Sequence, residues 1–324
     1  MHAWLCTNPT GVEALTWTEL PTPTPQAGEV LIEIKAASLN FPDLLIVQNK
    51  YQMKPPLPFV PGSEYAGTVV AVGEGVKHLQ VGQNVACLSG TGGFGTHTIA
   101  PAALCMPLPP GFPAVDAAAF IMIYATSHHA LVDRAQLKAG ETVLVLGAAG
   151  GVGTAAIQIA KALGARVIAA ASSDEKCALC TSIGADATIN YSKENLREAI
   201  KTLTDGKGPD VIYDPVGGDF AEPAFRSIAW RGRYLVVGFA SGPIPALPFN
   251  LALPKGASIV GVFWGEFAKR EPKANAAMMA ELAQWYGQGK IKPVIDRTMP
   301  MAQLPQAYAH MGSRGVMGKL VMVN

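Results

Sequence analysis

The sequence predicts an α/β protein that combines an irregular β-barrel with a doubly wound parallel sheet. Up to Ala100, many short strands are punctuated by glycine and proline, a pattern typical of irregular barrels. From Thr142 onward, a glycine-rich turn is followed by alternating strands and helices, which implies parallel strands covered by helices. The chain has 324 residues, 49% hydrophobic and 15% charged, which is enough for one or two domains with a large core.

The strands of the predicted barrel follow from alternation and punctuation. Glu29–Ala37 alternates, so that its apolar side chains share one face. The prolines of residues 21–25 form a spacer, and residues 40–51 are expected to be a loop. Further strands are expected at residues 68–72, 81–85 and 95–100. A proline-rich stretch, 107–113, then leads into an apolar run, 114–131, that predicts one long helix crossing between domains.

The glycine-rich turn predicts a dinucleotide-binding site. Thr142–Leu146 is a short, β-branched apolar run that suits a strand buried on both faces, and a helix follows until Gly164. Glycine lets the backbone approach a pyrophosphate, whose charge would lie at the amides of the helix start. The residues expected to do this are Ala149, Gly150, Gly151, Val152 and Gly153. Four glycines in mid-segment, and no aromatic or basic belt, disfavour the alternative of a transmembrane helix over residues 142–160.

Five more strands are expected to complete the parallel sheet. They lie at residues 166–171, 188–191, 210–214, 233–238 and 258–264. Apolar spacing predicts a helix between Pro272 and Lys290. Residues 292–299 and 319–323 then return to β-structure.

The composition excludes several functional classes. A formal net charge of +1 gives no footprint for nucleic acid or for an anionic membrane surface. Met1–Trp4 shows no basic segment followed by an apolar run, so no signal peptide is expected. The five cysteines are odd in number and scattered, as in a reduced compartment, and a cytoplasmic location is therefore expected.

The glycine-rich segment also carries a family signature. The matching residues are Gly140, Glu141, Leu144, Ala148, Ala149, Gly150, Gly151, Gly153, Gln158 and Lys161. At these positions the chain resembles the zinc-independent quinone oxidoreductases, the branch of the medium-chain dehydrogenase/reductases that includes the ζ-crystallins. The resemblance extends over nearly the whole chain. It implies a GroES-like catalytic domain at residues 1–118 and 265–324, and a Rossmann NADP-binding domain at residues 119–264.

The resemblance also indicates that no metal is bound. It places Asn40 and Ser63 where the zinc-dependent relatives have a cysteine and a histidine ligand. Asparagine and serine cannot replace a thiolate and an imidazole around Zn²⁺. The four-cysteine lobe of those relatives is also absent, because residues 89–101 contain no cysteine. Cys177 and Cys180 form an isolated pair in a predicted helix, without a second pair of ligands at metal spacing.

The end of the second parallel strand predicts NADPH rather than NADH. An NAD-dependent unit has an acidic residue there, whereas this chain has Ser172 and Ser173. A serine leaves room for a 2′-phosphate, and Lys176 can donate charge-assisted hydrogen bonds to it. Asp174 would repel the phosphate if it pointed inward, but it can instead occupy the first turn of a helix.

The resemblance implies further contacts with the cofactor. Tyr124 and Thr126 would line the nicotinamide, and Tyr191 would lie near the adenosine phosphate. Phe239, Phe263 and Trp264 are expected around the cofactor and acceptor, although each could be ordinary core, as could Phe41. Arg314 is either a cofactor-phosphate contact or a solvated surface arginine.

The expected catalytic residues are Asn40, Asp43 and Tyr51. Asn40 and Asp43 offer polar groups where the zinc enzymes polarise a carbonyl, and Tyr51 could donate a proton to the reduced oxygen. Without a Lewis acid, electron-poor acceptors become the natural substrates. The leading interpretation is therefore an NADPH-dependent quinone reductase. Its alternatives are a reductase of enones or enoyl thioesters, and a non-catalytic NADPH-binding protein. A homodimer is expected, with edge pairing of Ser258–Trp264 as one way to form it.

Overall fold

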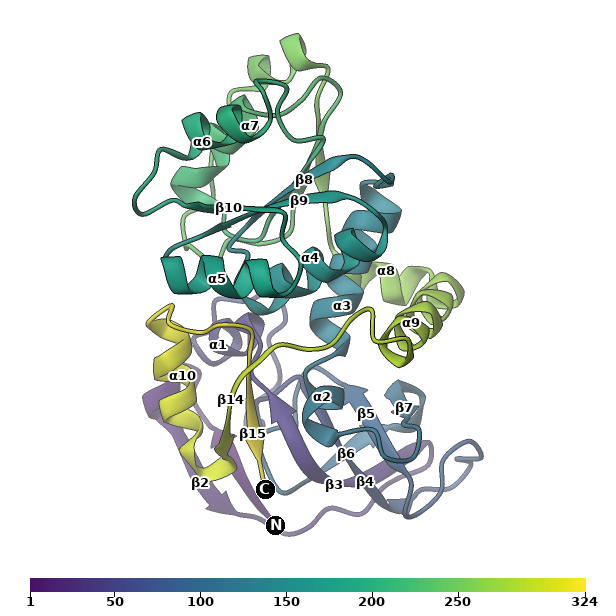
Figure 1. The fold of residues 1–324 in the computed structure, drawn as a ribbon. Coiled ribbons are helices and arrows are strands. Elements are labelled where there is room, and N and C mark those ends of the chain that lie inside the picture. Colours follow the sequence, from purple (N-terminus) through teal and green to yellow (C-terminus); the bar gives the residue numbers. More distant parts are fainter. The chain divides into compact units, whose positions relative to one another are not determined.

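The computed structural model describes all residues, 1–324, and divides into two compact units (Figure 1). The first unit contains Met1–Met122 and Ile295–Asn324, and the second contains Ile123–Val294. Residues 265–294, which the sequence analysis grouped with the catalytic domain, therefore lie in the second unit. Contacts of these residues within the second unit explain this difference, such as the 2.9 Å hydrogen bond between His128 and Glu281.

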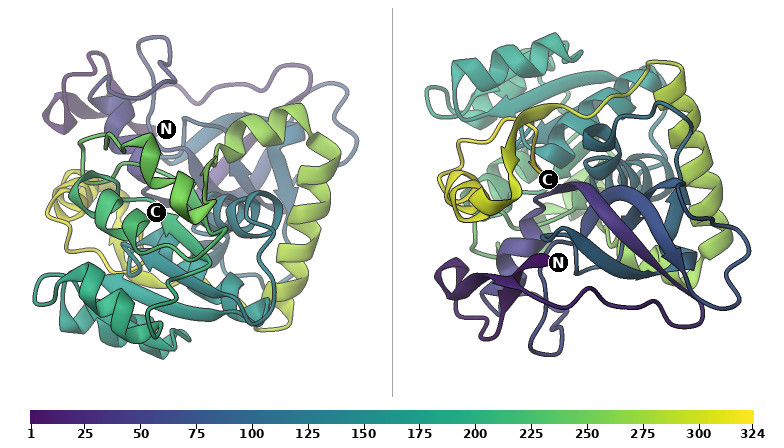
Figure 2. Two further views of the ribbon diagram at one scale, coloured as in Figure 1. Left: turned by 90° about the horizontal axis from the view of Figure 1, so that it is seen from above. Right: turned by 90° about the horizontal axis from the view of Figure 1, so that it is seen from below.

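A twisted, mostly antiparallel sheet organises the first unit. Its strand order is β14-β15-β3-β4-β5-β7, with β6 also paired to β3, and β1 and β2 form a separate hairpin. The strands are β1 (His2–Cys6), β2 (Leu15–Glu19), β3 (Glu29–Ser38), β4 (Glu64–Val72), β5 (Asn84–Leu88), β6 (His97–Pro101), β7 (Cys105–Pro107), β14 (Ile295–Pro300) and β15 (Lys319–Val323). The predicted return of the C-terminal strands to this sheet is observed, and both chain termini lie near one another here (Figure 2).

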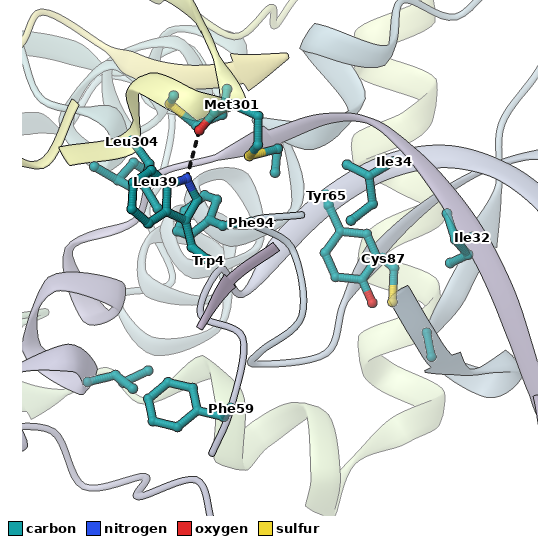
Figure 3. Close-up of a cluster of buried hydrophobic side chains, with 14 of the residues drawn as sticks. Trp4, Ile32, Ile34, Leu39, Phe59, Tyr65, Cys87, Phe94, Met301 and Leu304 are labelled. Carbon is teal, nitrogen blue, oxygen red and sulfur yellow. Dashed lines mark hydrogen bonds between the residues drawn. The ribbon is translucent and has the colours of Figure 1, made fainter. Parts of the chain in front are cut away.

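The core of the first unit joins the two ends of the chain. Trp4 donates a 2.8 Å hydrogen bond from its indole nitrogen to the carbonyl of Met301, and both side chains are buried (Figure 3). Phe94 packs edge-on against Tyr308 at a centroid distance of 6.1 Å. Three helices accompany the sheet: α1 (Phe41–Val47), α2 (Ala114–Ala118) and α10 (Leu304–Gly312).

The second unit contains the predicted doubly wound sheet. All six strands are parallel, in the order β10-β9-β8-β11-β12-β13. They are β8 (Thr142–Leu146), β9 (Arg166–Ala171), β10 (Ala187–Asn190), β11 (Val211–Asp214), β12 (Arg233–Val236) and β13 (Ser258–Gly261). Because β8 is the first strand, this order is the 3-2-1-4-5-6 arrangement of dinucleotide-binding sheets. The predicted fold class is therefore confirmed.

Helices cover both faces of the parallel sheet. Figure 1 shows α4 and α5 on one face, and α6 and α7 on the other. The helices of this unit are α3 (Ile121–His128, which begins within the first unit), α4 (Gly151–Ala162), α5 (Asp174–Ser182), α6 (Leu196–Leu203), α7 (Ala221–Arg226), α8 (Trp264–Arg270) and α9 (Pro272–Gly287). A π-helical segment, His129–Arg134, extends α3. No helix combines the length and the apolar character that crossing a membrane requires.

The apolar run at residues 114–131 forms several helical pieces rather than one long helix. The first piece, α2, ends at Ala118 and is capped by Ala119, whose amide bonds back to Asp116 only three residues away. Helix α3 follows and passes into the π-helical segment. Apolar composition alone could not reveal these interruptions, because most residues of the run are buried in each piece.

Candidate active site

Two positions of the turn between β8 and α4 can hold only glycine. Gly147 has a left-handed φ of +57°, and a Cβ there would lie 2.7 Å from Val216. A Cβ on Gly153 would lie 2.5 Å from the carbonyl oxygen of Gly147 and 2.7 Å from that of Ala148. Both distances are far too short, so these glycines let the helix start lie directly against the strand end.

The start of α4 is suited to an anion. Gly150 is its N-cap and has no side chain to accept from the first-turn amides. Those amides have no partner within the helix, and the helix dipole adds positive potential at this end. Ser127 donates a 3.0 Å hydrogen bond to the carbonyl of Val152 and also bonds the hydroxyl of Tyr213 at 2.9 Å. Ser127 thus holds the first turn of α4 in place, and the residues present there fit a pyrophosphate.

The turn from β9 to α5 gathers hydroxyl groups and one ammonium. Ser173 caps α5, accepting a 3.3 Å hydrogen bond from the amide of Lys176. The ammonium of Lys176 donates to the hydroxyl of Ser172 at 3.3 Å. The two residues predicted to hold a 2′-phosphate are therefore neighbours at the carboxyl end of β9, where nucleotide ligands bind in such sheets.

Asp174 is held by groups other than this pair. It lies in the first turn of α5, as one of the two sequence interpretations expected. Asn190 donates a 2.6 Å hydrogen bond to one of its carboxylate oxygens, and Lys193 bonds the other. The bond from Lys193 also holds the pKa of Asp174 below its usual range. The charge that could repel a phosphate is therefore compensated by an adjacent cation.

A third loop, between β11 and α7, is organised by a buried carboxylate that sequence reasoning missed. Asp214 accepts hydrogen bonds from the amides of Val216 at 2.7 Å and Gly217 at 2.8 Å, and from the hydroxyl of Tyr234. Gly217 lies against Phe239, since a Cβ there would be 2.9 Å from the ring. The only sequence signal was an acidic residue ending an apolar strand just before Pro215.

The aromatic cofactor candidates occupy different environments. Tyr191 packs against Phe220, with ring centroids 4.4 Å apart, and remains half-buried like Phe239. Tyr124 is fully buried on α3 and donates a 2.7 Å hydrogen bond to Gln158, whereas Thr126 on the same helix is half-buried. The hydroxyl of Tyr124 is thus directed into the protein.

Phe263 and Trp264 do not continue the edge strand, which ends at Gly261 instead of Trp264. Trp264 begins α8 and is buried, with its indole nitrogen bonded to Asn275 at 2.9 Å. Phe263, by contrast, is exposed.

In the first unit, Asn40 belongs to a buried polar network that the sequence did not reveal. Its side-chain oxygen accepts from the ammonium of Lys319, and its amide nitrogen donates to Glu64 at 3.0 Å and to Ser63 at 3.5 Å. Lys319 also donates to the carbonyl of Leu39 at 3.0 Å and lies 3.7 Å from Glu64. Burial lowers the pKa of Lys319, although the carboxylates of Glu64 and Asp43 oppose this effect. The signal was a lysine opening an otherwise apolar strand, KLVMV.

The carboxylate of Asp43 is also engaged in hydrogen bonds within the protein. It lies at the third position of α1 and is only 1% exposed. Its carboxylate accepts from the amide of Asn40 at 2.8 Å and from that of Ser63 at 3.0 Å. Burial raises its pKa to about 6, although these hydrogen bonds and the charge of Lys319 favour the ionised form. Asp43 therefore fixes segments 40–43 and 63–64 against each other.

Tyr51 is the one predicted catalytic side chain in this unit that keeps partial exposure. It packs against the core of the first unit and is half-buried. Burial raises the pKa of its phenol, and the nearby Asp43 adds to this effect, so the hydroxyl keeps its proton at neutral pH. Arg314 lies in an exposed loop of the same unit after α10, with a left-handed φ of 59°. Phe41, at the start of α1, is partly exposed.

The residues at Asn40 and Ser63 do not fit a zinc ion. No three histidine, cysteine, aspartate or glutamate side chains come together as metal ligands. An amide, a hydroxyl and the Lys319 ammonium lie there instead, and a buried cation would repel Zn²⁺.

Comparison with known proteins places this chain among oxidoreductases. Residues 26–110 match the alcohol dehydrogenase GroES-like domain, and residues 151–284 match the domain described as zinc-binding dehydrogenase. A quinone oxidoreductase-like protein 2 homolog of Nematostella vectensis is 38% identical over 91% of this chain and 81% of its own length. The quinone oxidoreductase of Pseudomonas aeruginosa is 35% identical over 97% of this chain and 96% of its own.

Solved structures agree with this placement. A mycobacterial protein complexed with NADPH superposes with a TM-score of 0.92 and 31% identity, covering 100% of both chains. The quinone oxidoreductase of Thermus thermophilus, also solved with NADPH, gives 0.86 and 33% identity, again covering both chains fully. The CurK enoyl reductase gives 0.88 with 27% identity, and 99% of each chain is covered.

The two domains define an oxidoreductase of the medium-chain dehydrogenase/reductase superfamily. Within that superfamily, the chain belongs to the zinc-independent quinone oxidoreductase branch. The resemblance carried by the glycine-rich segment is therefore confirmed.

Proposed function

We propose that this protein reduces small quinones with NADPH. The observation that carries the proposal is the buried network of Asn40, Ser63 and Lys319, which does not fit a metal ion. Without a Lewis acid, oxidation of simple alcohols loses its main electrostatic support, whereas electron-poor acceptors need less activation. The similarity to quinone oxidoreductases, two of whose solved relatives carry NADPH, supports the same assignment.

The cofactor is assigned to the second unit. When bound, NADPH supplies a hydride from its nicotinamide ring. The amides of Gly151 and Val152 at the start of α4 hold its pyrophosphate, while Ser172 and Lys176 hold the 2′-phosphate. The predicted contacts of Tyr124, Thr126, Tyr191, Phe239, Phe263, Trp264 and Arg314 with the cofactor remain part of this proposal.

Tyr51 is assigned the role of hydrogen-bond and proton donor to the oxygen of the acceptor. Its phenol remains protonated at neutral pH, so it can donate a hydrogen bond and then a proton to the oxygen as negative charge develops there. Asn40 and Asp43 act by positioning, because their polar atoms are taken up by Lys319, Glu64 and backbone amides. No charged nucleophile takes part in this scheme.

A second candidate function is the reduction of α,β-unsaturated carbonyls or enoyl thioesters. The similarity to the CurK enoyl reductase favours it, because the same fold and coverage are found there. A third candidate, an NADPH-binding protein without catalysis, requires only the glycine-rich turn and the β9–α5 turn. All three functions use a small molecule, and we expect no nucleic-acid or membrane partner. We expect a cytoplasmic location.

Steady-state assays with four compounds, three with NADPH and ethanol with NADP⁺, test these functions. We expect the fastest reduction with a benzoquinone, weaker activity with a short enone, and no reaction of ethanol with NADP⁺. Fastest turnover with an enoyl-CoA would favour the second candidate over the first. Binding of NADPH without turnover of any compound would leave only the non-catalytic function.

A further inference from the structure

Two cysteines face each other across neighbouring strands of the first unit. Strand β5 pairs with β7 so that Cys87 lies directly opposite Cys105. The amide of Leu108 bonds the carbonyl of Asn84 in the same register, which makes Asn84 and Leu108 a hydrogen-bonded pair. Pairs alternate along an antiparallel ladder, so Cys87 and Cys105 form a non-hydrogen-bonded pair, whose Cα atoms are typically about 4.5 Å apart. That spacing lies within the range of about 4.4–6.8 Å found in disulfides.

The two thiols already contact one another. The proximity of the two side chains lowers the pKa of Cys87 and raises that of Cys105, while the Cys105 thiol donates a 3.5 Å hydrogen bond to the carbonyl of Pro101. Tyr65 on β4 lies directly opposite Cys87 and bonds the hydroxyl of Ser89 at 3.0 Å, and Figure 3 shows the Tyr65 ring beside Cys87. The pair therefore contains one sulfur whose pKa is lowered and one whose pKa is raised. This is the arrangement that thiol oxidation requires.

Burial alone would make both residues ordinary core cysteines, since Cys87 is 0% and Cys105 5% exposed. The position of β7 gives an oxidant a way in. Strand β7 has three residues and lies at the edge of the sheet, paired only with β5. A short edge strand opens locally at low cost, which exposes both sulfurs without global unfolding.

The other paired cysteines provide a contrast within the same chain. Cys177 and Cys180 lie three residues apart in α5 and are also buried. Burial raises the pKa of Cys180 to about 12 and also raises that of Cys177. Neither sulfur is therefore activated, and this pair is the natural control.

We propose that Cys87 and Cys105 form a reversible disulfide when the protein meets a hydroperoxide. The Cys87 thiolate attacks the peroxide, takes one oxygen as sulfenic acid, and with a proton releases water. The Cys105 thiol then attacks that sulfur and expels a second water, so that two thiols and one hydrogen peroxide give one disulfide and two waters. This modification site does not depend on the proposed function.

The oxidised pair would act next to the candidate site. Ser89 bonds the hydroxyl of Tyr65 at 3.0 Å, and its amide donates to the carbonyl of Ser63 at 3.0 Å. Ser63 in turn bonds Asp43. Tyr65 and Ser89 therefore connect a change at Cys87 to Ser63, which belongs to the polar network.

Mass spectrometry of the native protein tests the proposal. The native chain is treated with hydrogen peroxide and then denatured in the presence of an alkylating agent, which blocks the free thiols. It is then digested without reductant. We expect two thiols per chain to escape alkylation, a linked peptide pair containing Cys87 and Cys105, and full reversal by dithiothreitol. The Cys177→Ala/Cys180→Ala variant should give the same result, whereas Cys87→Ala and Cys105→Ser should each lose the linked peptide.

Circular dichroism and thermal melting would verify that each variant is folded. Two outcomes would overturn the proposal. One is that the lost thiols map to Cys177 and Cys180. The other is that Cys87 and Cys105 stay fully alkylatable, or that Cys87 is oxidised to a sulfinic acid while Cys105 stays free.

Discussion

At the residue scale, the polar side chains of the first unit divide by whether their atoms are already in use. Asn40 and Asp43 are buried and fully engaged with neighbours, whereas Tyr51 is half-buried and keeps a proton that it can donate. The family resemblance could place Asn40 and Ser63 in one site, because it aligns both with the ligand positions of the zinc-dependent relatives. It could not predict Lys319, which lies 279 residues from Asn40 and reaches it only through strand pairing.

Replacement of Tyr51 by phenylalanine tests the proposed proton donor. We expect kcat for quinone reduction to fall by about 10²–10³, the loss found when one donor to a developing oxyanion is removed. KM should change little if the hydroxyl acts mainly in the transition state. Tyr286→Phe on α9 is the matched control and should behave like the wild type. An equal effect of both variants, or a change in KM alone, would remove Tyr51 from the chemistry.

At the scale of elements, pattern and punctuation predicted most of the parallel sheet. β8, β9 and β15 were predicted with the bounds that the structure shows. Strand β13 ends earlier than expected because Trp264 turns into α8, where Asn275 satisfies its indole. Helices α1 and α10 were not predicted. In α1 the helix-forming signal is the capping box of Asn40 and Asp43, which also serves as the site's polar framework.

The β9–α5 turn determines the expected choice of cofactor. Removing the ammonium in Lys176→Ala should weaken NADPH binding by about 1.5–3 kcal/mol, the range for a hydrogen bond to a charged group. NADH binding should hardly change, because NADH lacks the 2′-phosphate. Isothermal titration of both cofactors, with Lys201→Ala on α6 as the control, measures this difference. Equal losses for NADPH and NADH would mean that Lys176 supports only the fold of the turn.

At the scale of the whole molecule, chain topology rather than local pattern creates the first unit. Strand β15 pairs with β3 across nearly the full length of the chain, and β14 joins it in parallel. The family resemblance predicted this return, but placed its boundary at residue 265 instead of 295. Helix α9 is amphipathic in sequence, and only its contacts assign it to the second unit.

The open edge of the parallel sheet makes a homodimer the expected assembly. β13 has no neighbour on its outer side, and its Ile259 is 43% exposed. Pairing with a second β13 would satisfy the unpaired backbone groups and cover this side chain. Light scattering at micromolar concentration should give twice the mass of one chain. Ile259→Lys should reduce it to that of a monomer, whereas Val81→Lys in the first unit should not, and a monomeric wild type would contradict the assembly.

The central claim is that NADPH reduces a quinone in this protein without a metal. The most direct measurement is NADPH oxidation with a benzoquinone before and after exhaustive dialysis against a strong chelator, combined with elemental analysis of the purified chain. Because the buried amide, hydroxyl and ammonium of Asn40, Ser63 and Lys319 do not fit a metal ion, we predict no stoichiometric metal and an unchanged rate. One tightly bound metal per chain, with activity lost in chelator and restored by zinc, would contradict the claim.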